Sequence, residues 1–261
     1  MGGPAEYPRM IRPGHKPFDP IELAKRTEAI VCRRNEEGEL ERKYTAFYTV
    51  GVYKGIATGY VCGCNLRCYF CWSSPSRDYP ESRGRFHSPR AAMAKLLKCA
   101  SRSGVKRLRI SGGEPTIGRS HLLSLLELAE ESGAELFLLE TNGILFGADP
   151  SYVRDVAKFR KVHVRVSIKA GTPEAFQART GAQAWAFELP FKAIELLLDS
   201  GVSMHVALMC DPRLMGEAER AEALRRLAEL EPSLIRNLEE EDVDPYGMAM
   251  VRLRAAGVNI F

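Results

Sequence analysis

The sequence predicts an α/β protein, a partial (β/α)6 barrel preceded by an N-terminal extension that contains a β-hairpin. From residue 55 onward, short β-branched runs alternate with amphipathic segments of helical period, which indicates repeated βα units around a parallel sheet. Several predicted strands also alternate charged with apolar residues. An open doubly wound sheet is covered by helices on both faces, so its strands are almost continuously apolar. The polar faces therefore favour a barrel with a polar interior.

The N-terminal extension is expected over residues 1–54 and the barrel over residues 55–261. Residues 1–27 are rich in proline and charge, and no helix or strand is predicted there. Residues 28–49 indicate two strands joined by a turn at Asn35-Glu36-Glu37-Gly38.

The barrel is expected to begin with a strand near residues 56–61. The first helix opens at Ser88-Pro89, with serine as N-cap and proline at the first helical position, and it ends at Gly104. The remaining strands are predicted near residues 105–110, 135–139, 162–168, 203–209 and 234–243. The remaining helices are predicted near residues 119–132, 150–158, 189–200, 217–230 and 245–256. Loops at the carboxyl ends of the strands should then carry the functional residues.

The predicted strand 162–168 has the clearest polar face. Its valines and isoleucine share one face and its polar residues the other, because side chains alternate with a period of two. By this alternation, the basic residues expected in the lumen are Arg107, Arg109, Arg165, Lys169 and His205. Such a lumen would suit an anionic substrate. The alternative for each residue is an edge position that faces water.

Three cysteines after the first strand, Cys64, Cys68 and Cys71, form the motif C-x3-C-x2-C. Thiolates are the usual ligands of iron–sulfur clusters, four to a [4Fe–4S] centre, so three of them leave one iron for another ligand. With Cys62 added, four thiols could instead close a zinc site. Zinc sites usually pair two separated cysteine knuckles, and no second knuckle follows in this sequence. A cluster is favoured, and zinc is the alternative.

A glycine-rich turn, Ser111-Gly112-Gly113-Glu114-Pro115, ends the next predicted strand. Two glycines allow the backbone to approach a ligand that a Cβ atom would block. Alone, such a turn is also a common βα connection. Placed one strand after the cysteine motif, it strengthens the indication of a cofactor site.

Together, the two motifs resemble those of radical S-adenosylmethionine (SAM) enzymes, with Phe70 as the aromatic residue before the last cysteine. The resemblance implies a partial TIM-like barrel, a [4Fe–4S] cluster chelated by SAM, and reductive cleavage of SAM to a radical that abstracts hydrogen from a substrate. It implies these cofactor ligands: Cys64, Cys68 and Cys71 for the cluster, and Phe70, Gly112, Gly113, Glu114, Asn142, Ser167 and Lys169 for SAM.

Three of these SAM contacts, in two segments, depend on similarity to glycyl-radical activating enzymes. The segment Glu140-Thr141-Asn142-Gly143 is similar to a D/E-T-N-G segment that faces SAM in that branch, although an Asn-Gly turn explains it equally well. Ser167 and Lys169 stand where that branch has an Asp-Leu-Lys triplet. Serine in place of aspartate, and Trp72 in place of the usual histidine, depart from its pattern.

The other cysteines offer one candidate for the chemistry. Cys32 and Cys99 are expected to be structural, whereas Cys210 falls after the fifth strand and is a candidate for a substrate-side role. No other catalytic residue is predicted. The sequence contains no second cysteine cluster and no room for a cobalamin domain, which argues against the branches of the family that carry these groups.

The expected partners are SAM, a low-potential electron donor such as ferredoxin or flavodoxin, and an unidentified, possibly anionic substrate. Arginines and aromatic residues between Ser73 and Arg90 could bind RNA, although a solvated loop is the simpler interpretation. Glycyl-radical activation, small-molecule chemistry and RNA modification all remain open. A zinc- or cluster-bearing nucleic-acid-binding module without catalysis is the alternative from another class.

The location is expected to be cytoplasmic. No apolar stretch is long enough to span a bilayer, and the seven cysteines, an odd number with four clustered, favour reduced thiols over a disulfide framework. No membrane partner is expected.

Overall fold

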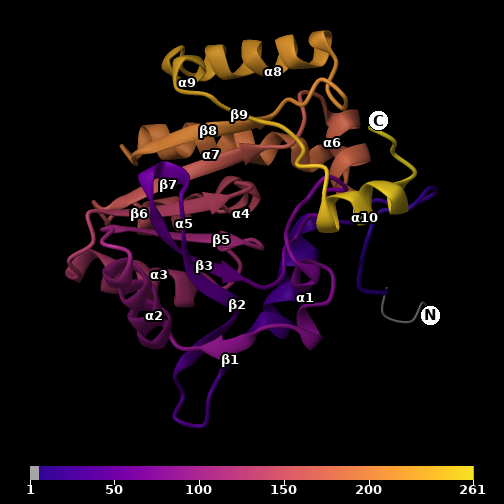
Figure 1. The fold of residues 1–261 in the computed structure, drawn as a ribbon. Helices are drawn as coiled ribbons and strands as arrows, with labels where there is room; N and C mark the ends of the chain where they lie inside the picture. Colours follow the sequence, from indigo (N-terminus) through magenta and orange to yellow (C-terminus); the bar gives the residue numbers. More distant parts are fainter. Residues whose placement is uncertain (1–5, 261) are drawn as a thin grey trace.

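A computed structural model describes residues 6–260. Its centre is a nine-stranded sheet in the order β1-β2-β3-β5-β6-β7-β8-β9, with β4 paired to β2 (Figure 1). The strands from β3 through β9 along this path pair in parallel. Six parallel strands linked by helices confirm the predicted partial (β/α)6 barrel, and the antiparallel strands β1 and β2 confirm the preceding hairpin.

The strands are β1 Cys32–Arg34, β2 Leu40–Val50, β3 Ile56–Val61, β4 Arg85–His87, β5 Arg107–Gly112, β6 Leu136–Thr141, β7 Val162–Ile168, β8 Met204–Met209 and β9 Glu239–Glu241. The helices are α1 Pro20–Val31, α2 Pro89–Arg102, α3 Arg119–Glu131, α4 Ile144–Ala148, α5 Pro150–Val156, α6 Pro173–Thr180, α7 Glu188–Asp199, α8 Glu217–Leu230, α9 Ser233–Arg236 and α10 Gly247–Ala256. No helix among residues 6–260 is both long and apolar enough to cross a membrane.

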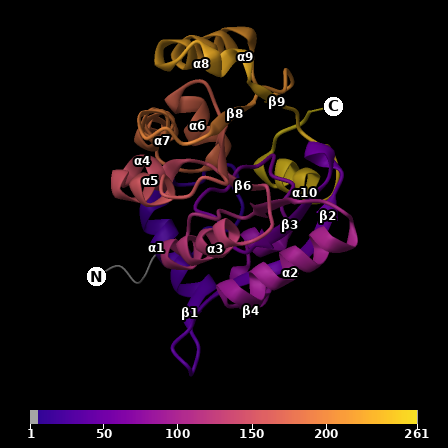
Figure 2. The ribbon, with the colours of Figure 1, turned by 90° about the vertical axis from the view of Figure 1, so that its left-hand side faces the viewer.

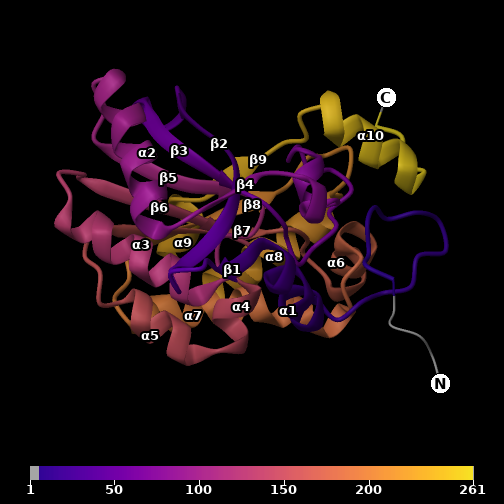
Figure 3. The same cartoon turned by 90° about the horizontal axis from the view of Figure 1, so that it is seen from below.

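The helices between the strands form an outer layer. Helix α2 packs against α3, α3 against α5, and α5 against α7, so that the layer follows the order of the strands (Figure 2). The apolar face of β7 meets this layer, because Val164 and Val166 are completely buried. Helices α1, α6 and α10 lie instead beyond the carboxyl ends of the parallel strands (Figures 1 and 3). They therefore surround the loops that follow the strands.

The prediction of no regular structure before residue 28 is wrong. Helix α1 begins at Pro20, where the Asp19 carboxylate accepts hydrogen bonds from the backbone N–H groups of Ile21, at 2.7 Å, and Glu22, at 3.2 Å. The pair Asp19-Pro20 is an N-cap followed by proline at the first helical position, the same signal that correctly predicted α2. The first hairpin strand consequently begins at Cys32.

The last predicted strand is shorter than expected, because residues 233–236 form α9 and only Glu239–Glu241 pair with β8. Helices α4 and α6 were not predicted. Both are short, with five and eight residues, and carry too few turns for a helical period to be visible.

The turn between β2 and β3 bridges the unpaired side of the barrel. Its two central residues, Tyr53 and Lys54, both have positive φ, at 53° and 60°, as in a type I′ hairpin turn. The Tyr53 hydroxyl donates to a carboxylate oxygen of Glu239 at 3.0 Å. This contact connects the turn before β3, the first parallel strand, to β9, the last parallel strand.

Candidate active site

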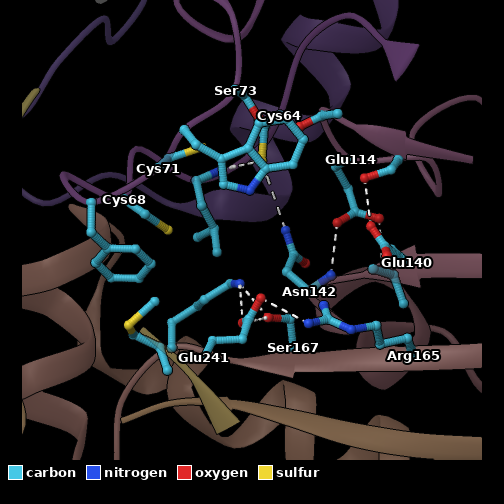
Figure 4. A pocket seen from close by; sticks show the side chains of 18 of the residues that line it. Cys64, Cys68, Cys71, Ser73, Glu114, Glu140, Asn142, Arg165, Ser167 and Glu241 are labelled. Atoms are coloured by element: carbon cyan, nitrogen blue, oxygen red, sulfur yellow. Dashed lines mark hydrogen bonds and ion pairs between the residues drawn. The ribbon is translucent and has the colours of Figure 1, made fainter. Parts of the chain in front are cut away.

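A cavity of about 440 Å³ opens among the loops at the carboxyl ends of the strands. This volume lies within the roughly 300–1,000 Å³ range of small-molecule sites. All ten residues predicted to bind the cluster and SAM line this cavity: Cys64, Cys68, Phe70, Cys71, Gly112, Gly113, Glu114, Asn142, Ser167 and Lys169. Figure 4 shows six of these side chains around it: Cys64, Cys68 and Cys71 on the cysteine loop, Glu114 and Asn142 after β5 and β6, and Ser167 on β7.

The cysteine loop is held by three buried arginines, one for each cysteine of the motif. Arg67 donates to the carbonyl oxygen of Cys64 at 2.8 Å, and Arg77 to that of Cys68 at 2.6 Å. The third, Arg252 of helix α10, donates to the carbonyl oxygen of Cys71 at 2.6 Å. Because each carbonyl is paired with a charged donor, the backbone of an otherwise irregular loop has a defined shape.

One arginine of the basic segment 73–90, which the sequence analysis considered for RNA binding, has a structural role instead. The guanidinium of Arg77 is paired at 2.5 Å with Asp78, which also pairs with Arg252 at 2.6 Å. All three side chains are at most 2 % exposed. Arg77 is therefore part of the support of the cysteine loop, whereas Arg83, Arg85 and Arg90 of the same segment are exposed.

The three thiols differ in their electrostatic surroundings. Burial, followed by the Glu114 carboxylate, raises the pKa of Cys64 to about 12. Burial likewise raises the pKa of Cys68 to about 11, against the opposing effect of Lys169. Burial also acts on Cys71, but the positive charges of Arg77 and Arg252, together with hydrogen bonds from Ser73, outweigh it and lower the pKa of Cys71.

Cys62 does not belong to this set of thiols. It is completely buried among Ala24, Val31 and Ile117, and it does not line the cavity. In residues 6–260, no group of three histidine, cysteine or acidic side chains is arranged to hold a metal ion. A single zinc ion requires ligands that converge on one point, whereas each thiolate of a four-iron cluster binds a different iron. The three cavity thiols fit the donor set of a cluster, and the four-thiol zinc site is not formed.

The glycine turn packs directly against the cysteine loop. A Cβ atom on Gly113 would lie 1.9 Å from the carbonyl oxygen of Gly63, and Gly112 has a φ of +98°. The N–H groups of Gly113 and Glu114 donate to the carbonyl oxygens of Val61 and Gly63, at 2.9 and 2.8 Å. The glycines are thus needed because two stretches of backbone touch, a reason that the sequence analysis did not identify.

Glu114 connects the turns that follow β5 and β6. Its buried carboxylate accepts hydrogen bonds from the hydroxyls of Thr116 and Thr141, both at 2.7 Å, and from the N–H of Asn142 at 2.8 Å. The side chain has a structural function whether or not it also binds a ligand.

Three of the five basic residues expected in the lumen, Arg109, Arg165 and Lys169, line the cavity, and each lies within 4 Å of a carboxylate. Arg165 forms two hydrogen bonds of 2.9 Å with Glu239 and one of 2.8 Å with Glu241. Arg109 pairs with Glu140 at 2.9 Å, and the Lys169 ammonium donates to the Ser167 hydroxyl. These three residues therefore line the cavity as predicted, but their carboxylate partners leave them without free positive charge.

The two remaining basic residues of that expectation do not add free charge to the cavity. Arg107 does not line it and instead donates to the backbone oxygen of Tyr53 at 3.4 Å. A ring nitrogen of His205 lies 3.0 Å from the Glu239 carboxylate. Burial alone would raise the pKa of Glu239, but hydrogen bonds from His205 and Arg165 lower it well below its usual value.

Glu239 and Glu241 line the cavity, and the sequence analysis did not identify them as site residues. They lie two residues apart in the predicted last strand, so the period of two could have placed both on the inner face. Cys210, the one catalytic candidate, does not line the cavity, and its sulfur lies 3.5 Å from a carboxylate oxygen of Glu240. Burial and that carboxylate raise the pKa of Cys210.

Residues 60–230 match the Radical SAM superfamily. Because the match covers more than half of the chain, the protein belongs to this superfamily, whose members are enzymes that use a [4Fe–4S] cluster and SAM.

Individual relatives differ in the reactions that their names describe. The chain is 27% identical over 186 residues to 7-carboxy-7-deazaguanine synthase of Rhodopirellula baltica, covering 71% of this chain and 62% of that protein. It is 30% identical over 135 residues to GTP 3′,8-cyclase of Syntrophomonas wolfei, covering 51% and 40%. Its fold resembles that of SuiB of Streptococcus suis bound to the precursor peptide SuiA, with a TM-score of 0.52, 18% identity, and coverage of 70% and 37%. The chain spans less than two thirds of the length of each of them.

Proposed function

We propose that this protein cleaves SAM reductively at a [4Fe–4S] cluster held by Cys64, Cys68 and Cys71, and that the resulting radical abstracts hydrogen from a small molecule. The observation that supports this most strongly is the packing of the cysteine loop against the Gly112–Gly113 turn at one end of a single cavity. When bound, the reduced cluster supplies the electron that breaks the sulfonium C–S bond of SAM.

The residues of the chain would bind and orient SAM across the cavity. The Lys169 ammonium, on the β7 side and near Cys68, would pair with the carboxylate of SAM. Oxygen Oε2 of Glu114 accepts one hydrogen bond within the protein, from Asn142, so it could accept another from the amino group. Phe70 lines the cavity and would offer an apolar face to the adenine.

A small-molecule substrate agrees with the cavity volume of about 440 Å³. The cavity is flanked on one side by Tyr53, whose contact with Glu239 bridges the open side of the barrel. The names of two relatives refer to small molecules: one to cyclisation of GTP and the other to synthesis of a deazaguanine. Because carboxylates neutralise Arg109 and Arg165, the lumen favours a polar substrate with both donor and acceptor groups over a simple polyanion.

The first test is anaerobic reconstitution with iron and sulfide, followed by addition of SAM and a strong reductant. We expect 5′-deoxyadenosine and methionine in equal amounts. Cys68→Ala should lose both cluster and cleavage, whereas Cys62→Ala should retain both, because Cys62 does not line the cavity. A protein that binds one equivalent of zinc without sulfide would contradict the proposal.

Replacement of Lys169 tests the proposed SAM site. Hydrogen bonds to charged groups contribute about 1.5–3 kcal/mol, so Lys169→Met should weaken SAM binding by about 10-fold or more. Iron and sulfide content should not change. The control is Lys158→Met, which removes an exposed lysine paired with Asp155. Equal dissociation constants for the two variants, measured by equilibrium binding, would remove Lys169 from the site.

A further inference from the structure

The side-chain amide of Asn142 lies between the cysteine loop and the turn after β6. Its nitrogen is 3.9 Å from the sulfur of Cys64 (Figure 4). The same nitrogen is 2.8 Å from the side-chain oxygen of Asn65. The sulfur of Cys64 also accepts the backbone N–H of Leu66 at 3.4 Å. One cysteine of the motif therefore has two N–H donors directed at it.

The orientation of the Asn142 amide is determined by its partners. Its oxygen accepts the backbone N–H of Ile144 at 3.1 Å, and a backbone N–H can only donate. The NH₂ group must consequently face Cys64 and Asn65, and exchanging oxygen and nitrogen would break the bond to Ile144. The backbone N–H of Asn142 is itself bound to Glu114 at 2.8 Å, so the residue is held at both ends.

Asn65 is the second member of this arrangement. It is completely buried, and its oxygen is occupied by the Asn142 amide. Its side-chain nitrogen is buried without a hydrogen-bond partner in the described structure. Asn65 does not line the cavity, so its contact with the site is made through the Asn142 amide that it holds in place.

We propose that Asn142, positioned by Asn65, donates an N–H···S hydrogen bond to the Cys64 thiolate and thereby raises the reduction potential of the cluster. Reduction adds negative charge that spreads over the sulfurs, and an N–H donor stabilises the reduced form more than the oxidised form. This inference rests on the proposed function only in requiring a [4Fe–4S] cluster on Cys64. It gives Asn142 a different role from the SAM contact that the resemblance implies.

The test is the midpoint potential of the reconstituted protein without SAM, measured by a redox titration monitored by electron paramagnetic resonance. Asn142→Leu should shift the potential to a more negative value, with unchanged iron and sulfide content and unchanged SAM affinity. Asn142→Asp is the second variant, because it preserves the acceptor for Ile144 and removes the N–H donor. The control is Ser111→Ala. Ser111 lines the same cavity, but its hydroxyl is bound to Glu140, so this substitution should leave the midpoint potential unchanged.

A double-mutant cycle tests the positioning role of Asn65. Asn65→Leu should shift the potential in the wild-type background and have a smaller effect in the Asn142→Leu background, because the two residues act in sequence. If both Asn142 variants have the same midpoint potential as the wild type, the inference is overturned. If these variants instead lose SAM affinity without a change in potential, Asn142 belongs to the SAM site. A wild-type protein that takes up no cluster would overturn both the proposed function and this inference. A wild-type protein that takes up a cluster, with unchanged potentials in the variants, would overturn this inference alone.

Discussion

At the scale of single residues, the site depends on close contacts between loops that lie far apart in the sequence. The positions of Gly112 and Gly113 after a strand already indicated a special backbone, but a ligand was the expected cause. In the structure, the carbonyl oxygen of Gly63 occupies the space where a Cβ atom of residue 113 would lie. A glycine that contacts backbone leaves less room for adjustment than one that faces a flexible ligand.

Gly113→Ala should therefore destabilise the reconstituted protein. Overpacking of this kind costs about 1–3 kcal/mol, which corresponds to roughly 2–4 °C in Tm per kcal/mol for a chain of this size. The turn and the cysteine loop would also separate, so iron content should fall. The matched control is Gly133→Ala, because an added Cβ atom there would meet no atom within 4 Å. Equal Tm values for the two variants would contradict this explanation.

At the scale of elements, helix α3 carries a buried titratable group against β4. A ring nitrogen of His121 lies 3.1 Å from the carbonyl oxygen of His87, and burial, followed by Arg42, lowers the pKa of His121 to about 3. An unfolded histidine titrates near 6.5. The unfolded state therefore binds a proton between about pH 6.5 and 3 that the folded state does not, so stability falls as the pH falls through this range.

Comparing His121→Gln with the wild type tests this contribution. Glutamine can donate to the same carbonyl but does not titrate, so the variant should lose less stability between pH 7.5 and pH 5 than the wild type. The measurement is Tm at both pH values under anaerobic conditions. Identical losses of Tm in the two proteins would show that another group controls acid sensitivity.

At the scale of the whole molecule, helix α10 completes the site from the far end of the chain. Arg252 donates to the carbonyl oxygens of Cys71 and Ser73 and pairs with Asp78, residues more than 170 positions earlier. Its side chain is 1 % exposed. The cysteine loop thus depends on a helix that is not one of the units between the parallel strands.

Arg252→Leu should lower both stability and cluster content. Breaking a buried ion pair costs on the order of 3–5 kcal/mol because the partner charge remains buried, although Arg77 would still neutralise part of the Asp78 charge here. Arg254→Leu is the control, because Arg254 lies on the same helix and is exposed. Anaerobic Tm and iron content are the measurements, and a loss of the same size in both variants would mean that the helix, not the buried pair, is responsible.

Local signals determined which elements form and which residue types carry the chemistry. The period of two, the helix caps and the spacing of Cys64, Cys68 and Cys71 all act within a few residues, so they are visible in the sequence. Two such signals were not used: the Asp19-Pro20 cap predicts α1, and the period of two places Glu239 and Glu241 on the inner face of β9.

Only the tertiary structure decided how these residues are paired. The partner of Arg165 is Glu239, 74 residues later, and the anchor of Cys71 is Arg252, 181 residues later. Neither the pairing of the lumen arginines with carboxylates nor the backbone contact at Gly113 has a local signature, because each arises where distant segments meet. The sequence by itself determined a cluster motif on a barrel, and long-range contacts decided the charge and shape of the site around it.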